Sequence, residues 1–394
     1  MANTYLLTRE QLQLQGWARE LALAHFQQDA ERWEREGLFP WDHFATLAQH
    51  GILGLTLPRA YGGQERPRLD AILVQEQIAR VCFTTAEAAH ICLNGPSYAI
   101  GRIGSPALQE KYLPGVVAGN YLLGIAITEE QAGSSVGEVT TRATPTAGGV
   151  IIDGNKCFTT AGDIARAFQV IARFGGENLR GLGSVIVDAH TPGFSVVRVY
   201  QKMGGNGIHE ASLRFEHCYV PAENILIPGD PQTEDGFKLS MRTYNTLRLG
   251  LAANALGVAQ AALDLLVPHL LTRRQFGSSL ANFQGLRWRV ARLALALEQA
   301  RLLTYRAAQL QDEYGFPPAY ETAMAKLAAT EVALEATDAA IQMFGWRGIT
   351  TDCPAQRLYR EIRGWTIAGG TSEILLDAIA RTLFRHYEQE LSPH

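Results

Sequence analysis

The chain has 394 residues, of which 47% are hydrophobic and 19% are charged, and its formal net charge is -4. This composition is typical of a soluble globular protein with a sizeable core, and the weak negative charge gives no reason to expect nucleic acid or an anionic membrane as a partner. The length allows two or three structural units.

The five cysteines show no CxxC spacing and are Cys82, Cys92, Cys157, Cys218 and Cys353. An odd, dispersed set predicts free thiols in a reducing compartment, not a disulfide framework or a metal site. The N-terminus, from Met1, shows no basic segment followed by an apolar stretch, and no apolar run approaches the ~20 residues that a membrane span needs. We therefore expect a cytoplasmic protein.

Residues 1–120 are expected to form an N-terminal helical domain. Thr8 and Gln11 have the spacing of a capping box at the start of the first helix. Further helices are expected at 41–51, 69–88 and 89–103, with a turn rich in glycine and proline at 51–63.

Residues 121–232 change to a strand pattern and are expected to form a small β-barrel or sandwich. Leu213, Phe215, His217 and Tyr219 alternate with polar residues, which predicts that these four side chains share the buried face of one strand. Short apolar runs at 150–152, 184–187 and 194–197 predict further strands separated by turns.

Residues 233–394 return to a helical pattern with long apolar stripes. Helices are expected from about 236 to 272, at 286–314 and at 319–344, and a fourth helix follows a glycine-rich turn at 366–374. Such helices predict a C-terminal four-helix bundle, so the fold class is α+β multidomain.

Several short segments occur in an order that resembles the acyl-CoA dehydrogenase family from end to end. Residues 51–63 resemble the family's GLLG…PEEYGG landmark, and residues 109–114 resemble its QKKYLP landmark. The resemblance implies a three-part architecture, FAD as cofactor, and a substrate acyl group carried by CoA or by an acyl-carrier protein.

The loop at 124–135 is rich in small, hydroxyl-bearing residues whose N–H and O–H groups can bind a polar ring edge or a phosphate. It resembles the family's TEPxAGSD segment, with Glu130 in place of proline and Ser135 in place of aspartate. The resemblance implies that Ile127, Thr128 and Ser134 line the isoalloxazine ring, and that Ser134 also faces the thioester.

Residues 156–160 resemble the family's KxWIT segment. By this resemblance, Phe158 packs on the flavin and Thr160 forms a hydrogen bond to it. Phenylalanine can stack as the usual tryptophan does, but it lacks the indole N–H.

Two further segments resemble the family's contacts with the cofactor's diphosphate. Arg273, Phe276 and Gln284 match its RxxFG motif and the glutamine that follows, and Arg273 is thereby expected to meet the diphosphate of a flavin held mainly by a neighbouring subunit. A guanidinium suits this role because it donates in a bidentate fork. Gln342 and Gly345 resemble the QxxGG segment, with tryptophan at the second glycine.

A flavin shared between subunits implies a homodimer or homotetramer. The sequence contains no GxGxxG motif and no P-loop, so a Rossmann-type nucleotide site is not indicated.

The turn at 366–374 joins two helices, and its adjacent glycines, Gly369 and Gly370, allow the backbone to approach a ligand closely. Read alone, it is an ordinary helix–helix turn. By the resemblance it covers the flavin, with Thr371 and Glu373 on the cofactor side, and the family's catalytic carboxylate would stand at the position of Gly369. The glycine keeps only the backbone N–H that polarises the thioester carbonyl.

No catalytic base is assigned. Some family members place a glutamate on the first bundle helix instead, and that position is Leu247 here. Tyr244, Asn245 and Arg248 beside it are expected to contact substrate, together with both glycines of the turn.

Three other acidic candidates are weak. Glu373 is expected to complement the dipole of the helix that it begins. The pair at 209–210 reads as a solvated loop pair, and the cluster at 360–363 reads as surface or interhelical ion pairs.

Three functions remain open from the sequence. The first is FAD-dependent α,β-dehydrogenation of an acyl thioester with a non-standard base, with electron-transfer flavoprotein or oxygen as the electron acceptor. The second is a flavin-dependent oxidase or monooxygenase on the same fold. The third is a non-catalytic subunit of a hetero-oligomer.

Overall fold

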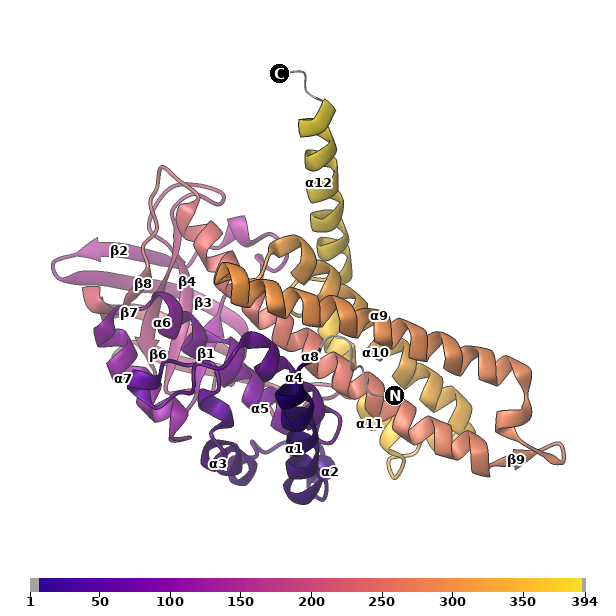
Figure 1. The fold of residues 1–394 in the computed structure, drawn as a ribbon. Coiled ribbons are helices and arrows are strands. Elements are labelled where there is room, and N and C mark those ends of the chain that lie inside the picture. The colour runs from indigo at the N-terminus through magenta and orange to yellow at the C-terminus, as the bar shows by residue number, and fades with distance from the viewer. Residues whose placement is uncertain (1–6, 392–394) are drawn as a thin grey trace.

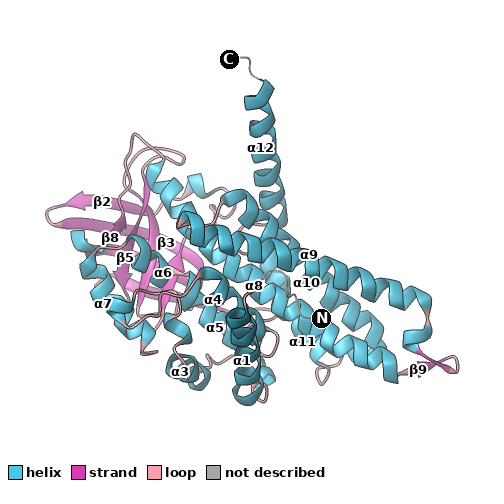
Figure 2. Ribbon diagram, viewed as in Figure 1, coloured by secondary structure: helices cyan, strands magenta, loops and turns pink. Residues whose placement is uncertain are grey.

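The computed structural model describes residues 7–391, and the N-terminal residue Met1 lies outside this range. An N-terminal group of helices and a β-sheet unit lie together, and a bundle of long helices extends away from them (Figures 1 and 2). The N-terminal helices are α1 (Arg9–His25), α2 (Ala30–Glu36), α3 (Trp41–Gln49), α4 (Arg68–Ala79), α5 (Phe83–Asn94), α6 (Pro96–Ile103) and α7 (Pro106–Val117).

The capping box at the first helix is confirmed. The Thr8 hydroxyl accepts from the Gln11 N–H, and the Gln11 side chain accepts from the Thr8 N–H. The expected helices at 69–88 and 89–103 have wrong boundaries. The chain breaks at Cys82, which has extended backbone angles, and again where proline at 96 begins α6.

The middle strands all belong to one eight-stranded sheet with the order β6-β7-β3-β2-β4-β5-β8, and β1 pairs with β4 in parallel. The strands are β1 (Leu123–Ala126), β2 (Arg142–Thr146), β3 (Gly149–Thr160), β4 (Ala167–Arg173), β5 (Leu182–Asp188), β6 (Phe194–Tyr200), β7 (Glu210–Pro221) and β8 (Ile225–Ile227).

The expected alternation along β7 holds for only half of the strand. Leu213 and Phe215 are buried, whereas His217 and Tyr219 are exposed and Cys218 is buried in their place. A β-bulge opposite β3 causes the change, because His217 has a φ of 53° and the extra residue turns the following side chains to the other face.

The C-terminal helices form the expected bundle. They are α8 (Asp235–Thr272), α9 (Gln284–Tyr314), α10 (Ala319–Phe344), α11 (Pro354–Arg363) and α12 (Ser372–Leu391), with a short hairpin of β9 (Arg274–Gln275) and β10 (Ser278–Ser279) after α8. Gly315 ends α9 with a φ of 80°, and proline at 318 precedes α10.

Helix α8 is long and apolar enough to cross a membrane by length and composition alone. Within the protein, 78% of its most apolar 18-residue window is buried. Its apolar surface therefore serves the core where α8 packs against α4, α9 and α10.

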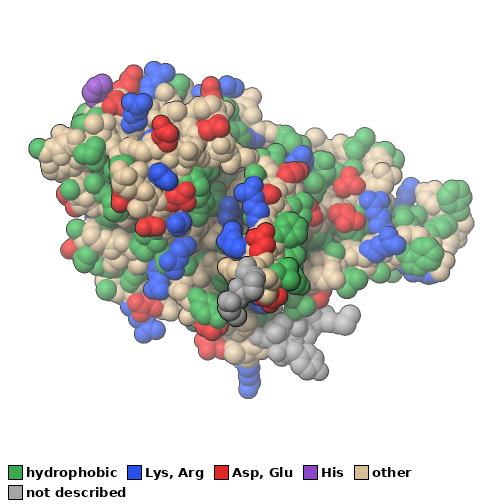
Figure 3. Space-filling model, turned by 90° about the horizontal axis from the view of Figure 1, so that it is seen from above, with side chains coloured by type: hydrophobic (Ala, Val, Ile, Leu, Met, Phe, Trp, Pro, Cys, Tyr) green, Lys and Arg blue, Asp and Glu red, His purple; other side chains and the backbone are tan. Residues whose placement is uncertain are grey.

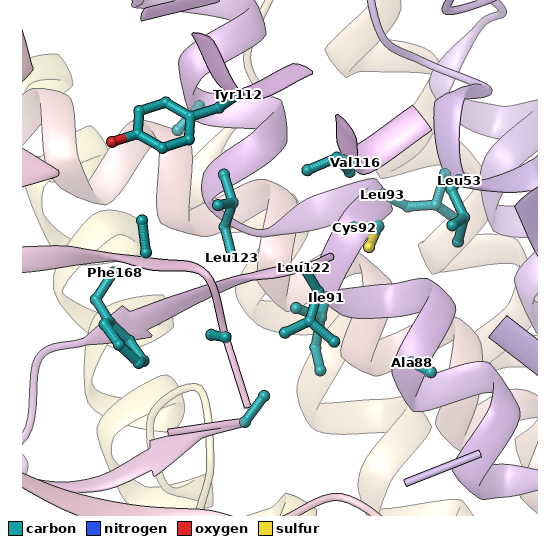
Figure 4. Packing of buried hydrophobic residues seen from close by; sticks show 14 of the residues in the cluster. Leu53, Ala88, Ile91, Cys92, Leu93, Tyr112, Val116, Leu122, Leu123 and Phe168 are labelled. Carbon is teal, nitrogen blue, oxygen red and sulfur yellow. The ribbon is translucent and has the colours of Figure 1, made fainter. Parts of the chain in front are cut away.

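Two main hydrophobic cores hold these parts. The first joins the N-terminal helices to the sheet, and Figure 4 shows Ile91 and Cys92 of α5 near Leu122, Leu123 and Phe168. The second lies within the bundle and includes α8, α9, α10 and α11. Helices α4 and α5 pack against α8, so the N-terminal helices and the bundle meet along α8.

Helix α12 extends away from the rest of the molecule. It projects alone from the body in Figure 1, and Leu375 is its buried residue among those described. On the face shown in Figure 3, acidic and basic side chains are interspersed, in keeping with the small net charge.

Candidate functional site

The turn before α12 is tied to the bundle through its carbonyl groups. Gly369 and Gly370 have φ values of 74° and 95°, in the left-handed region that glycine favours. Arg248 Nε of α8 donates to the Gly369 oxygen at 2.7 Å, and Lys326 Nζ of α10 donates to the Gly370 oxygen at 2.9 Å.

The amide groups of the same turn remain available. Within residues 7–391, the N–H groups of Gly369 and Gly370 donate to no protein acceptor. The Gly370 N–H belongs to the same planar peptide group as the Gly369 carbonyl, so the bond from Arg248 fixes its direction. Both glycine N–H groups can therefore bind an oxygen atom of a ligand.

At position 369, a side chain would require the flexible end of the Leu251 side chain to move and would strain the backbone. A Cβ atom there would lie 2.5 Å from Leu251 Cδ1, and the positive φ would strain any residue other than glycine. The backbone at the position where the family's catalytic carboxylate is expected therefore favours glycine.

Lys326 was missed by sequence reasoning, because its apolar helix gives no sign of what the ammonium contacts. Its side chain is fully buried, and no carboxylate forms an ion pair with it among the described residues. Burial, with a smaller contribution from the charge of Arg248, lowers the pKa of Lys326 to about 7. It lies beneath the turn and is a positioning residue.

This low pKa predicts a pH-dependent stability. An unfolded lysine titrates near 10.4, so between pH 7 and about 10 the unfolded chain holds a proton that folded Lys326 has released. Stability should therefore rise with pH across this window, by up to a few kcal/mol. Urea unfolding of wild type and Lys326→Met at pH 6.5 and 9.5 checks this, since the variant should lack that rise. An identical rise in both would contradict it.

The residues expected on the substrate side of α8 do come together at the turn. Arg248 Nη1 donates to Asn245 Oδ1 at 2.8 Å, and the guanidinium lies 5.3 Å from the centre of the Tyr244 ring. Leu247 is half-buried against the bundle core, so the second position expected for a base carries an apolar side chain.

The strands expected to hold the flavin ring also meet. The Cys157 N–H donates to the Thr128 oxygen at 2.8 Å, and Lys156 Nζ donates to the Ile127 oxygen at 2.9 Å. Phe158 is 53% exposed with a φ of 52°, and its ring centre lies 5.1 Å from that of Tyr200. An exposed aromatic side chain on a bulged strand offers a surface on which a planar ring can stack.

Glu129 anchors this wall and was also missed. It is buried, and its carboxylate accepts from Lys156 Nζ at 2.8 Å and from the N–H groups of Thr140 and Thr141 at 2.7 and 2.9 Å. Burial alone would raise the pKa of Glu129, but the Lys156 charge and these hydrogen bonds lower it to about 2. The glutamate joins the expected flavin loop to β3.

For three further residues of the described chain that were expected to bind the cofactor, the structure shows no hydrogen bond to the strand wall. Ser134 is exposed in the loop after β1. The Thr371 hydroxyl accepts from the Ile374 N–H at 3.3 Å and so caps α12. Glu373 is exposed in the first turn of α12, where its own backbone N–H and the Thr371 hydroxyl lower its pKa, as expected of a carboxylate at a helix start.

The residues expected at the diphosphate form a second, separate group. Arg273, Phe276 and Gln284 are exposed at the far end of the bundle. Gln342 and Gly345 end α10 at the same tip, where the Phe344 ring stacks on His269 at 4.0 Å. In Figure 1 the β9 hairpin lies at the opposite end of the molecule from the sheet. The residues expected at the flavin ring and those expected at the diphosphate therefore cannot bind the same flavin molecule when both come from one chain.

One expectation about acidic residues is wrong, and a second holds only in part. The pair at 209–210 is not a solvated loop pair, because Glu210 begins β7 and is buried, and its Oε1 accepts from the Thr160 hydroxyl at 3.1 Å. His209 bridges Asp163 and the Gly37 carbonyl oxygen.

In the cluster at 360–363, Arg360 forms an interhelical ion pair, as expected, with Glu34 of α2 at 2.6 Å, whereas Glu361 is not on the surface. It is buried and pairs with Arg357 at 2.9 Å. Burial raises the pKa of Glu361 to about 7.

The residues present fit a flavin. The strand wall offers the exposed Phe158 ring, the half-buried Thr160 hydroxyl, and the Thr159 hydroxyl, which is buried without a hydrogen-bond partner among the described residues. At the bundle tip, a Cβ on Gly345 would meet no atom within 4 Å, so the end of α10 is open to a bulky ligand.

Several known proteins that are similar to this chain have names that include a CoA thioester substrate. The chain is 36% identical to the acryloyl-CoA reductase (NADH) of Anaerotignum propionicum over 384 residues, covering 97% of this chain and 96% of that protein. It is also 36% identical to a 3-sulfinopropanoyl-CoA desulfinase of Paraburkholderia xenovorans over 382 residues, covering 96% of each.

Solved structures share the whole fold. Butyryl-CoA dehydrogenase from Megasphaera elsdenii superposes with a TM-score of 0.89 at 30% identity, covering 96% of this chain and 99% of that one. A structure described as PigA with FAD and proline superposes with a TM-score of 0.90 at 25% identity, covering 96% and 98%.

Three domain descriptions together span most of the sequence. The N-terminal, middle and C-terminal domains of acyl-CoA dehydrogenase match residues 8–120, 124–218 and 234–384. The family's acyl-CoA dehydrogenases and reductases are oxidoreductases that act on CH–CH bonds, and the family uses FAD. This chain belongs to the acyl-CoA dehydrogenase family.

Proposed function

We propose that this protein catalyses the FAD-dependent interconversion of an acyl-CoA and its 2-enoyl-CoA, with proton transfer at the α-carbon by a group other than residues 369 and 247. The turn carries this proposal. Its carbonyls are tied to Arg248 and Lys326, and its N–H groups are left without protein acceptors.

The turn would bind the thioester carbonyl through these N–H groups. Hydrogen bonds to that oxygen draw electrons from the α-carbon and make its proton more acidic. The guanidinium of Arg248, which is largely buried, adds a positive charge close to the oxygen, where the low local dielectric strengthens its effect.

FAD, when bound, would accept the hydride from the β-carbon. The chain's part is to place the two carbons between the turn and the Phe158 strand and to exclude water. Since Leu247 and Gly369 carry no proton acceptor, the α-proton would pass to a group on the substrate or to a side chain at neither of these positions, and oxidation would be slow in the absence of a fixed base.

Anaerobic titration of the purified flavoprotein with acyl-CoAs of increasing chain length tests this function. Bleaching of the flavin absorbance by at least one saturated thioester is the expected result. Oxygen consumption that depends on an added reductant would instead support an oxidase or monooxygenase. Flavin that responds to no thioester or reductant would favour a non-catalytic subunit.

The electron acceptor and the acyl carrier are part of the proposal. Reoxidation by electron-transfer flavoprotein, in preference to oxygen, is the arrangement that the family resemblance implies. Parallel titration with butyryl-CoA and a butyryl-carrier protein would decide between the two carriers.

A second candidate function is a reaction without net oxidation, such as hydrolysis of the carbon–sulfur bond of 3-sulfinopropanoyl-CoA, the substrate named for the related desulfinases. In this step a water oxygen bonds to sulfur to give sulfite, and a proton is added to the carbon that sulfur leaves. The absence of a carboxylate at residues 369 and 247 favours it, because Arg248 and Lys326 then lie at the turn without a neutralising acid. Sulfite release with the flavin still oxidised would identify this reaction.

Helix α12 is proposed to pack against another copy of the chain in a homodimer or homotetramer. Along one stripe it exposes Leu376, Leu383, Phe384, Tyr387 and Leu391, each at least 41% exposed. In such an assembly the bundle tip of one chain can reach the flavin of its neighbour.

Charges on this stripe should therefore break the assembly. For Phe384→Glu with Tyr387→Glu we expect a smaller oligomer by light scattering and at least a several-fold loss of bound FAD, because the neighbour's Arg273 leaves the diphosphate. Arg385→Glu, on another face of the same helix, should leave both unchanged. An unchanged mass for the double variant would contradict this interface.

A further inference from the structure

Two buried glutamates lie near one lysine where the three parts of the chain meet. Glu87 of α5 and Glu210 of β7 are each 9% exposed, and each has a buried Oε2 with no hydrogen-bond partner among residues 7–391. Lys202 Nζ lies 3.8 Å from Glu210 Oε1 and contributes a weaker electrostatic attraction to Glu87.

Glu87 differs from the other buried glutamates of the described chain. Each of the others has a basic partner within hydrogen-bond or ion-pair distance: Glu34 with Arg360, Glu76 with Arg301, Glu129 with Lys156, Glu210 with Lys202 and Glu361 with Arg357. No salt bridge or hydrogen bond to a basic side chain is found for Glu87. Lys202 is the only cation among the causes that act on the pKa of Glu87, and it is already near Glu210.

This group lies between the two walls of the proposed active site. On the sheet side, Glu210 accepts from Thr160, two residues after Phe158. On the bundle side, Phe83 and His90 flank Glu87 on the same face of α5, and both rings contact Trp365 at 5.0 and 6.1 Å. Trp365 lies four residues before Gly369, so α5 packs between the segment that leads to the turn and the strand that carries Phe158.

The charges of the group do not balance. Two carboxyl groups share one ammonium, so one of them lacks a counter-ion when both are ionised. Burial raises the pKa of Glu87 to about 8 and that of Glu210 to about 7, against the opposing charge of Lys202. A buried acid without a partner destabilises the fold, and such a cost is commonly retained where a ligand supplies the partner.

We propose that Glu87, together with Glu210, forms a subsite for the far end of the acyl group and that this end carries an ammonium. The inference rests on the proposed function, because the acyl group must enter between the turn and the strand wall. A cation there would satisfy the free oxygens of both carboxylates. An acyl group ending in a carboxylate or sulfinate would instead meet two acids.

Binding of matched CoA thioesters to the flavoprotein tests this subsite. The set is 3-aminopropanoyl-, butyryl- and succinyl-CoA, and the longer set is 6-aminohexanoyl-, heptanoyl- and pimeloyl-CoA. Dissociation constants are taken from isothermal titration calorimetry and from the shift of the flavin spectrum. We expect one of the two amino thioesters to bind about ten- to a hundredfold more tightly than its methyl-ended partner, and the dicarboxylic thioesters to bind more weakly than either.

The variant Glu87→Gln keeps the size of the side chain and removes its charge, so it should abolish the preference for the amino thioester over butyryl-CoA. Glu20→Gln, on the exposed side of α1, is the matched control and should keep the preference. If the wild type binds butyryl- or succinyl-CoA as tightly as the amino thioesters, the subsite is refuted but the proposed function stands. If no CoA thioester binds, both fail. The wild-type comparison decides the question even if Glu87→Gln does not fold.

Discussion

Replacing Lys156 with methionine should lower the free energy of unfolding by about 3 to 5 kcal/mol and remove most of the bound FAD. The reason is that Glu129 would remain buried as a carboxylate without its cation. Removal of one member of a buried ion pair costs more than the pair contributes, because the charge left behind is no longer solvated. Urea unfolding and the flavin-to-protein absorbance ratio measure the two effects.

The cofactor effect follows from the second hydrogen bond of the lysine. Lys156 Nζ also donates to the Ile127 oxygen, so it joins β3 to the segment that presents Thr128. Lys238→Met is a suitable control, since its pair with Asp235 is 3.7 Å apart and both side chains are largely exposed. Such a pair contributes little, roughly 0 to 1 kcal/mol. Equal effects of the two substitutions would contradict this role for Lys156.

The ion pair of Glu129 with Lys156 also makes the free energy of unfolding depend on pH in the acid range. The folded pKa of Glu129, about 2, lies below the unfolded value near 4.3. The contribution of Glu129 is therefore complete above about pH 4.3 and is lost as the pH falls towards 2.

Leu247→Glu should increase the rate of anaerobic flavin reduction by a saturated acyl-CoA by about a hundredfold or more. A positioned general base contributes about 10² to 10⁴ in rate. Position 247 is half-buried, next to Arg248 and beside the turn, so a carboxylate can be accommodated there with a cation nearby. Stopped-flow absorbance at the flavin band measures the rate.

Gly369→Glu should fail to produce this gain. A Cβ at that position meets Leu251 Cδ1 at 2.5 Å, and the φ of 74° adds strain of about 1 to 2 kcal/mol. Adding Leu251→Ala removes the contact and should restore part of the rate. A large gain from Gly369→Glu alone, with none from Leu247→Glu, would show that the turn can take a side chain and that this account of the missing base is wrong.

The sequence predicted the long helices well because their signals are local. The expected helix at 319–344 has the bounds of α10, since proline starts it and glycine ends it. The break between α4 and α5 was missed because no glycine or proline lies at Cys82. The exposed His217 was missed because a bulge depends on the partner strand as well as on the strand itself.

The parts of the candidate site that lie in a recognisable sequence motif or a glycine turn could be predicted from the sequence. Gly369 and Phe158 were found through the resemblance of their segments to family motifs, and Gly369 also stands out as one of two adjacent glycines. Lys326, Glu129 and Glu87 were not, because their roles depend on contacts with distant segments that no spacing reveals. Helical periodicity marks Lys326 only as a lysine on an apolar helix.

A structure of the protein with FAD and butyryl-CoA bound tests the central claim most directly. We expect the isoalloxazine ring against Phe158, with the thioester carbonyl at the N–H groups of Gly369 and Gly370, and the diphosphate near Arg273 of a neighbouring copy. A thioester bound elsewhere, with the turn N–H groups still unpaired, would contradict this account.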